Sequence, residues 1–212
     1  MLTVGFRIAR EGIRWFVIFL ALSCVALPFS VGAALTALVC GVLAALFFRI
    51  PTRVAPRGEG LVLSPADGKV VGVDDLEEPR FMQGPCRRVS IFLSIFDVHM
   101  NYAPVSGVIE WVHYQPGRFH WAFEPKASEN NENQRIGIAC GRGKILVRQI
   151  AGAVARRIVL FKQATQEIIQ GERIGMIKFG SRVEIYLPRA FTIKVAVGDR
   201  VAGGLTVLAE AL

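Results

Sequence analysis

The chain has 212 residues, a length that allows one substantial domain with an appendage. Its hydrophobic content of 52% and formal charge of +8 indicate an acidic partner, either nucleic acid or an anionic membrane face. No basic stripe is interleaved with aromatic residues, which disfavours nucleic acid. The four cysteines form no CxxC pair, so they indicate neither a disulfide framework nor a zinc site, and they suit a reducing compartment.

Two apolar runs, 13–27 and 31–48, lie near the start of the chain. Each is near or below the roughly 20 residues that a helix needs to cross a bilayer. Arginines flank the pair on both sides: Arg7, Arg10, Arg14, Arg49, Arg53 and Arg57. Because basic residues prefer the cytoplasm, both ends are expected on that side. We therefore predict that 1–48 forms a helical hairpin associated with the cytoplasmic side of the cell membrane.

Two other interpretations of this region stay open. A cleaved signal peptide has a similar layout, with an arginine-rich start, an apolar core and small residues at 32–34. The second uncharged run argues against it, because a mature secreted domain would not begin with such a segment. A pair of helices buried in a soluble domain is the other alternative.

Residues 49–60 contain two prolines and two glycines and are expected to form a linker. Over 61–212, short stretches of alternating apolar and polar residues are separated by turns that contain glycine, which predicts β-strands. The turns at 65–70, 104–112 and 197–204 resemble the hairpins of lipoyl- and biotinyl-carrier domains. The sequence therefore predicts a mainly β domain, a sandwich or barrel, over this region.

The segment 119–135 interrupts this pattern. It is long, polar and poor in strand-forming residues. Loops of this kind inside a compact domain are often functional, so we expect a binding or catalytic loop, with an ordinary solvated loop as the alternative.

Gly180 and Ser181 interrupt the alternation of 172–188. The usual explanation for such a pair is a bulge, a tight bend or a close backbone approach. The other is a reaction, in which Ser181 Oγ attacks the carbonyl of Gly180, because glycine leaves that carbonyl open and permits a strained backbone. The local pattern does not decide between them.

A serine nucleophile needs a base, usually an imidazole that a carboxylate orients. His99 lies at a strand end, where catalytic side chains are common. His113 lies inside an alternating strand, which favours a structural role, and His120 lies in the polar loop, where it could contact a ligand. Asp67 in its Asp-Gly turn indicates, by itself, only a turn. Three separated histidines form no metal-binding pattern, so no metal site is expected.

Four motifs occur in a fixed order: Ser64-Pro65-Ala66-Asp67-Gly68, Phe96-Asp97-Val98-His99-Met100-Asn101 with Pro104-Val105-Ser106-Gly107, Lys126-Ala127-Ser128-Glu129-Asn130 with Glu132-Asn133, and Phe179-Gly180-Ser181. With the apolar N-terminus, they closely resemble the phosphatidylserine decarboxylase proenzymes, in particular their short form. The resemblance covers nearly the whole chain.

This resemblance implies an enzyme that cleaves itself and depends on a pyruvoyl group. Asp67, His99 and Ser181 match the processing triad of that family. Cleavage between Gly180 and Ser181 would give a β chain of 1–180 and an α chain that starts at the former Ser181, and the two would stay together. The residue at 181 would become the pyruvoyl cofactor, whose ketone takes up the electrons released as CO₂ leaves. Decarboxylation of phosphatidylserine would give phosphatidylethanolamine.

The resemblance also suggests residues that bind the substrate. Lys126, Ser128, Glu129 and Asn130 match a family signature whose individual tasks are open. Arg182 could pair with the phosphate or carboxylate of the substrate, or could be a charge at a strand edge.

The sequence departs from the long form of the family at two places. Phe96 stands where the long form has a further histidine, so another group must take any role of that histidine. The motif Phe179-Gly180-Ser181-Arg182 is like the short form and differs from the Leu-Gly-Ser-Thr of the long one.

Two rival functions stay open. One is a membrane-anchored, lipoyl-like β adaptor that is never cleaved. The other is a pyruvoyl enzyme that acts on a soluble amino acid, which the apolar N-terminus disfavours. The expected partners are a phospholipid substrate, the membrane and, as an open possibility, further copies of the chain.

Overall fold

The computed structural model describes residues 5–117, 131–152, 157–178 and 181–211. The chain divides into two compact units, 1–53 and 54–212. Their boundary lies inside the expected linker 49–60, whose first three residues form a strand of the first unit.

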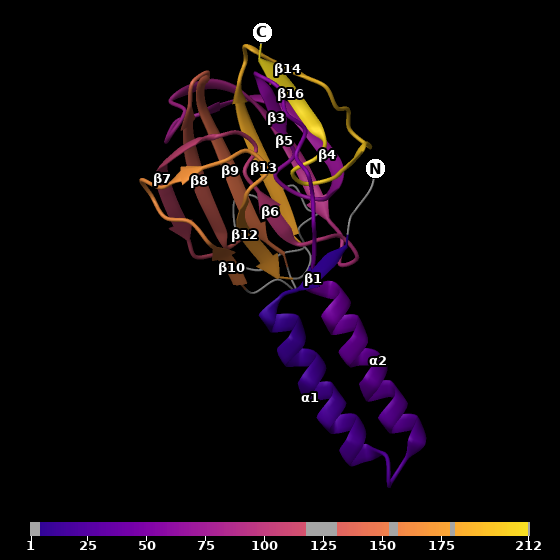
Figure 1. The fold of residues 1–212 in the computed structure, drawn as a ribbon. Helices are drawn as coiled ribbons and strands as arrows, with labels where there is room; N and C mark the ends of the chain where they lie inside the picture. The colour runs from indigo at the N-terminus through magenta and orange to yellow at the C-terminus, as the bar shows by residue number, and fades with distance from the viewer. Residues whose placement is uncertain (1–4, 118–130, 153–156, 179–180, 212) are drawn as a thin grey trace. The chain divides into compact units, whose positions relative to one another are not determined.

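The first unit contains the two helices α1 (Arg10–Ala26) and α2 (Val31–Phe47), which lie side by side as a hairpin (Figure 1). Ser30 precedes α2, and its Oγ accepts a hydrogen bond from the backbone N–H of Ala33 at 3.3 Å, which caps the helix. At the helix contact, a Cβ added to Gly41 would lie 2.9 Å from the Cβ of Phe19, so the close approach requires glycine. The short strands β1 (Phe6–Ile8) and β2 (Arg49–Pro51) pair at the base of the hairpin.

The outer surface of this hairpin is apolar. Its exposed large hydrophobic residues come from both helices and from the connection between them: Ile13, Trp15, Val17, Ile18, Leu20, Leu22, Val25, Leu27, Phe29, Val31, Leu35, Val39, Val42, Leu43 and Leu46. None of the helices in the described part of the chain combines the length and the apolarity that crossing a membrane requires.

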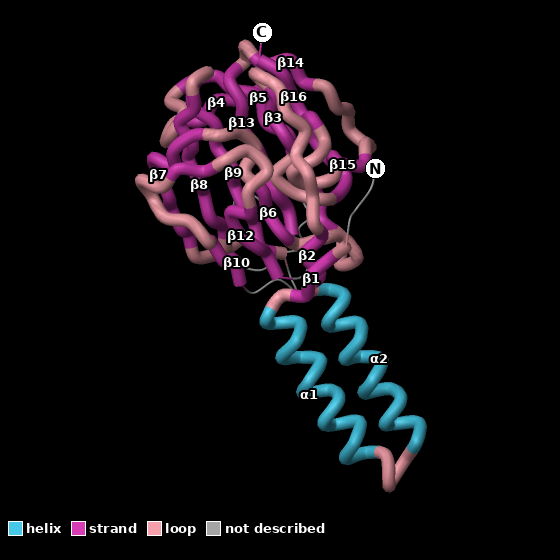
Figure 2. Tube along the Cα trace, in the orientation of Figure 1, coloured by secondary structure: helices cyan, strands magenta, loops and turns pink. Residues whose placement is uncertain are grey.

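The second unit is built from strands, which confirms the prediction of a mainly β domain (Figure 2). Its main sheet curls around the core and has eight antiparallel strands, in the order β11 (Glu167–Ile168), β7 (Gly107–Gln115), β8 (Asn133–Cys140), β9 (Gly143–Ala151), β13 (Ser181–Pro188), β5 (Gly84–Leu93), β4 (Gly68–Glu78) and β15 (Arg200–Val201). One small sheet has the order β10 (Arg157–Leu160), β12 (Arg173–Lys178) and β6 (Met100–Tyr102). The other has the order β14 (Phe191–Ile193), β16 (Val207–Ala211) and β3 (Leu61–Leu63).

Strand β13 lies in the interior of the main sheet, between β5 and β9. Its residues alternate between the two faces, as the period of a strand requires. Val183, Ile185 and Leu187 belong to the main hydrophobic core. Tyr186 packs into a smaller cluster on the opposite face. Ser181, an even number of residues before Val183, therefore shares the core face.

Candidate functional site

Ser181 is the first residue of β13 and is fully buried. It pairs with Leu93 at the end of β5 and with Ala151 at the end of β9. Its Oγ has no hydrogen-bond partner among the described residues. A buried hydroxyl without a partner is costly, and such groups are often part of a reaction site. Gly180, the predicted carbonyl partner, lies outside the described residues.

Asp67 immediately precedes β4 at the same end of the main sheet. Lys69 pairs with Phe92, so Gly68 reaches the level of Leu93. A Cβ at Gly68 would lie 2.2 Å from the carbonyl oxygen of Phe92, and its φ of +148° also favours glycine. The Asp-Gly turn is thus a close-packed start of strand β4. Since β4 and β13 are two strands apart in the sheet, about 10 Å separates their backbones at the usual strand spacing.

The Asp67 carboxylate accepts a hydrogen bond from the backbone N–H of Gly203 at 2.7 Å. The turn before it contacts β6, because the carbonyl of Pro65 accepts from the Tyr102 N–H at 2.9 Å. Since β6 follows directly after His99, the Asp67 turn and the His99 segment adjoin.

His99 lies between the turn that follows β5 and strand β6, and its side chain is buried. Its Nδ1 is 2.9 Å from the backbone carbonyl oxygen of Asp97. A carbonyl can only accept, so in the neutral ring Nδ1 carries the proton and Nε2 is the basic nitrogen. The role of Asp67 toward this ring stays a prediction.

A buried polar pair lies close to His99 and Ser181 along the chain. Gln149 lies opposite Val183 in the main sheet, and its Nε2 donates to Oδ1 of Asn101 in β6 at 2.7 Å. Both side chains are fully buried. His99 comes two residues before Asn101, and Ser181 comes two residues before Val183, the partner of Gln149. The His99 and Ser181 backbones therefore each lie two residues from this contact.

Strand β12 joins the two at the backbone. The N–H of Ile177 donates to the carbonyl of His99 at 3.1 Å, and the chain then reaches Ser181 within four residues. The structure thus brings the backbone segments of all three predicted triad residues to one end of the domain.

The predicted signature residues Lys126, Ser128, Glu129 and Asn130 lie outside the described residues, as does His120. The residues that follow this signature, Asn131 and Glu132, form hydrogen bonds with Ala151 near the candidate site. Asn131 donates from Nδ2 to the carbonyl of Ala151 at 2.8 Å, and the carbonyl of Glu132 accepts from the Ala151 N–H at 2.9 Å. Because Ala151 pairs with Ser181, the end of this segment lies next to the serine.

The structure places Arg182 on a different face of β13 from Ser181, and its contact with the substrate stays a prediction. Neighbouring residues of a strand point to opposite faces, so Arg182 lies on the face away from the Ser181 side chain. It is buried, and this burial lowers the pKa of its guanidinium, against the opposing charge of Glu184. Its side chain belongs to a polar cluster on that face.

Glu184 is the centre of this cluster and is fully buried. Its Oε2 accepts from the Tyr186 hydroxyl at 2.7 Å. Its two carboxylate oxygens lie 3.7 Å from Arg88 of β5 and from Arg148 of β9, one oxygen toward each. The cluster therefore ties β13 to both of its neighbours. Burial, followed by the Glu184 charge, raises the pKa of Tyr186 to about 12.

His113 lies in β7, where its ring is part of an aromatic stack. Its ring stacks on Trp111 at 5.5 Å with an interplanar angle of 4°, and Trp111 in turn stacks on Phe81. Within the described residues, no group of three or more His, Cys, Asp or Glu side chains could hold a metal ion.

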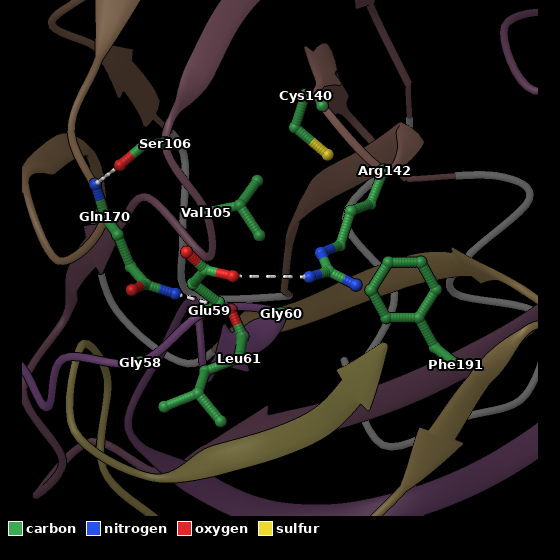
Figure 3. Close-up of a pocket in the computed structure, with 11 residues that line it drawn as sticks. Gly58, Glu59, Gly60, Leu61, Val105, Ser106, Cys140, Arg142, Gln170 and Phe191 are labelled. Atoms are coloured by element: carbon green, nitrogen blue, oxygen red, sulfur yellow. Dashed lines mark hydrogen bonds and ion pairs between the residues drawn. The ribbon is translucent and has the colours of Figure 1, made fainter. Parts of the chain in front are cut away.

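The pocket in Figure 3, of about 340 Å³, lies elsewhere. It is lined by Gly58, Glu59, Gly60, Leu61, Val105, Ser106, Cys140, Gly141, Arg142, Gln170 and Phe191. Cys140 is the last residue of β8 and Arg142 lies in the turn before β9, whereas Ser181 pairs with the last residue of β9. The length of β9, about 25 Å, therefore separates this pocket from Ser181.

Two site residues escape sequence reasoning, Asn101 and Gln149. Asn101 lies two residues after His99, so the period of a strand could have placed it on the same face. Gln149 carries no local signal, because its partner lies 48 residues away in another sheet.

Comparison with known proteins finds one family throughout. A family model described as phosphatidylserine decarboxylase matches residues 41–209. A phosphatidylserine decarboxylase proenzyme of Symbiobacterium thermophilum is 43% identical over 204 residues, which cover 95% of this chain and 94% of that protein. Similar proenzymes of Carboxydothermus hydrogenoformans (49% over 164 residues, 76% of each chain) and Syntrophus aciditrophicus (42% over 200 residues, 93% and 94%) also match.

Proposed function

Because the chain belongs to the phosphatidylserine decarboxylase family, we propose that it converts phosphatidylserine to phosphatidylethanolamine and CO₂ after cutting itself between Gly180 and Ser181. One observation carries this proposal. The buried Ser181 residue begins an interior strand, its hydroxyl has no partner among the described residues, and the backbone of His99 is bonded to Ile177, four residues before it.

In the proposed cleavage, Ser181 Oγ attacks the carbonyl carbon of Gly180 while His99 takes the hydroxyl proton at Nε2. The Asp97 carbonyl holds the ring at Nδ1, and the Asp67 carboxylate stabilises its positive charge. The C–N bond breaks as His99 passes this proton to the departing nitrogen, and an ester replaces the amide. Loss of the α proton of residue 181 then breaks its Cβ–O bond, which frees the Gly180 carboxylate. Water replaces the remaining nitrogen, which leaves as ammonia, and a pyruvoyl group stands at the new N-terminus.

The surroundings of Ser181 fit such a group. The serine is fully buried at the end of a strand that is paired on both sides, so its backbone is fixed while its Oγ has no competing partner among the described residues. The pyruvoyl ketone supplies the electron sink for decarboxylation. His99 would then return a proton to the carbon that loses CO₂, since an imidazole can both take up and give back a proton.

The two products of the cut would stay associated. The proposed α chain contains β13, β14, β15 and β16, and each of these pairs with strands of the proposed β chain or with one another. In particular, β13 pairs along its length with β5 and for six residues with β9.

The helical hairpin fits a membrane enzyme on the cytoplasmic side. Its apolar side chains are exposed on both helices, as expected for a surface in contact with lipid. The formal charge of +8 favours an anionic leaflet. Sedimentation of the full chain with anionic vesicles, and weaker sedimentation with neutral ones, would support this placement; no sedimentation with either would contradict it.

The activity is tested with vesicles that contain phosphatidylserine labelled at its carboxyl carbon. The wild-type chain should release labelled CO₂ and form phosphatidylethanolamine, whereas Ser181→Ala should release none above background. An uncleaved adaptor would give no product from either chain, and an enzyme for soluble amino acids would leave the lipid intact.

A further inference from the structure

The turn between β5 and His99 presents two apolar side chains to solvent. Ile95 is 52% exposed and Phe96 is 79% exposed. They occupy the middle of a four-residue turn from Ser94 to Asp97, where glycine, asparagine, aspartate or proline is usual. Exposed apolar residues at such positions need an explanation beyond the turn itself.

Hydrogen bonds hold this turn in shape. The Asp97 carboxylate accepts from the Ser94 N–H at 2.8 Å, and the Asp97 N–H donates to the Ser94 carbonyl at 3.0 Å. The Ser94 hydroxyl also accepts from the Phe96 N–H at 3.3 Å. The exposure of the two apolar residues is therefore a property of an ordered turn.

The turn lies at the end of the domain that carries the candidate site. It follows Leu93, the strand partner of Ser181, and it ends two residues before His99. Basic side chains flank it. Arg200 forms an ion pair with Asp97 at 2.9 Å while its side chain stays 72% exposed, and Lys69, also exposed, is its cross-strand partner.

We propose that Ile95 and Phe96 enter the apolar edge of a lipid bilayer while Lys69 and Arg200 face lipid phosphates. Apolar residues at a tip with basic residues behind them match the layers of an anionic membrane surface. This contact brings the His99 end of the domain to the depth at which lipid headgroups lie. The inference rests on the proposed function, because a lipid substrate gives the contact its purpose.

Photocrosslinking in the full-length chain tests the contact directly. Phe96 is replaced by p-benzoylphenylalanine, and Phe161, an exposed phenylalanine next to the opposite end of β12, serves as the matched control. After irradiation with anionic phosphatidylglycerol vesicles, mass spectrometry should find lipid adducts on the peptide with position 96 and not on the peptide with position 161. No lipid on position 96, equal labelling of both, or crosslinks from 96 to protein alone would overturn the proposal.

Kinetics give a second, independent test. Ile95→Ser with Phe96→Ser should lower kcat/KM on vesicle substrate at least about tenfold, whereas Phe161→Ser with Ile169→Ser should change it less than about twofold. Equal losses in both would contradict the proposal, with melting temperatures as the check on folding. Phosphatidylglycerol crosslinking needs no catalysis. A chain that labels at 96 but never cleaves itself would therefore overturn the proposed function and leave the membrane contact standing.

Discussion

At the scale of single residues, the account depends on the base that serves Ser181. The contact of His99 Nδ1 with a carbonyl fixes the proton on that nitrogen, so Nε2 must act. We predict that His99→Gln slows self-cleavage by about 10²- to 10⁴-fold, because glutamine keeps a donor for the Asp97 carbonyl but cannot take a proton. The fraction cut is followed by intact mass over time. Cleavage of this variant at the wild-type rate would exclude His99 as the base.

Tyr186 gives a pH dependence of known sign. Burial, together with Glu184, raises its pKa to about 12, so the folded state favours the neutral hydroxyl. The unfolded chain ionises near pH 10, so stability present below pH 10 is lost between about pH 10 and 12, by about 2–3 kcal/mol. In the Ser181→Ala background, the free energy of unfolding should fall more steeply over this range with Tyr186 than with Tyr186→Phe. Parallel curves would contradict the assignment.

At the scale of elements, the contact between β6 and β9 sets the spacing of the two sheets beneath the site. We predict that Asn101→Ala and Gln149→Ala each cost about 1–3 kcal/mol of folding free energy, because each leaves a buried amide without its partner. Each should also slow self-cleavage. The double variant should cost less than the sum, since both remove one contact. Additive losses in stability would show that the two side chains act separately.

The strands themselves could largely be predicted from the sequence, because alternation decides which residues of β12 and β13 face the core. The substrate contact of Arg182 stays a prediction, because its neighbouring position in the strand puts its side chain on the face opposite Ser181. The Asn101–Gln149 contact could not be predicted, because it depends on how two sheets stack. The membrane contact of the hairpin stays a prediction.

At the scale of the whole molecule, cleavage should leave one particle made of two chains. Strands of the proposed α chain pair with strands of the proposed β chain, above all β13 with β5 and β9. Cleavage does not break the hydrogen bonds between these strands. We predict that the wild-type protein elutes as one species in native gel filtration and as two chains in denaturant. Elution of the small chain alone under native conditions would contradict this.

The most direct test of self-cleavage is the mass of the purified wild-type protein under denaturing conditions, compared with that of the Ser181→Ala variant. The account predicts two wild-type chains, one ending at Gly180 and one starting at position 181. The second should be lighter than the corresponding serine peptide by one ammonia and blocked to Edman degradation, and the variant should stay whole. A wild-type chain that stays intact with serine at 181, after long incubation with lipid, would contradict the account.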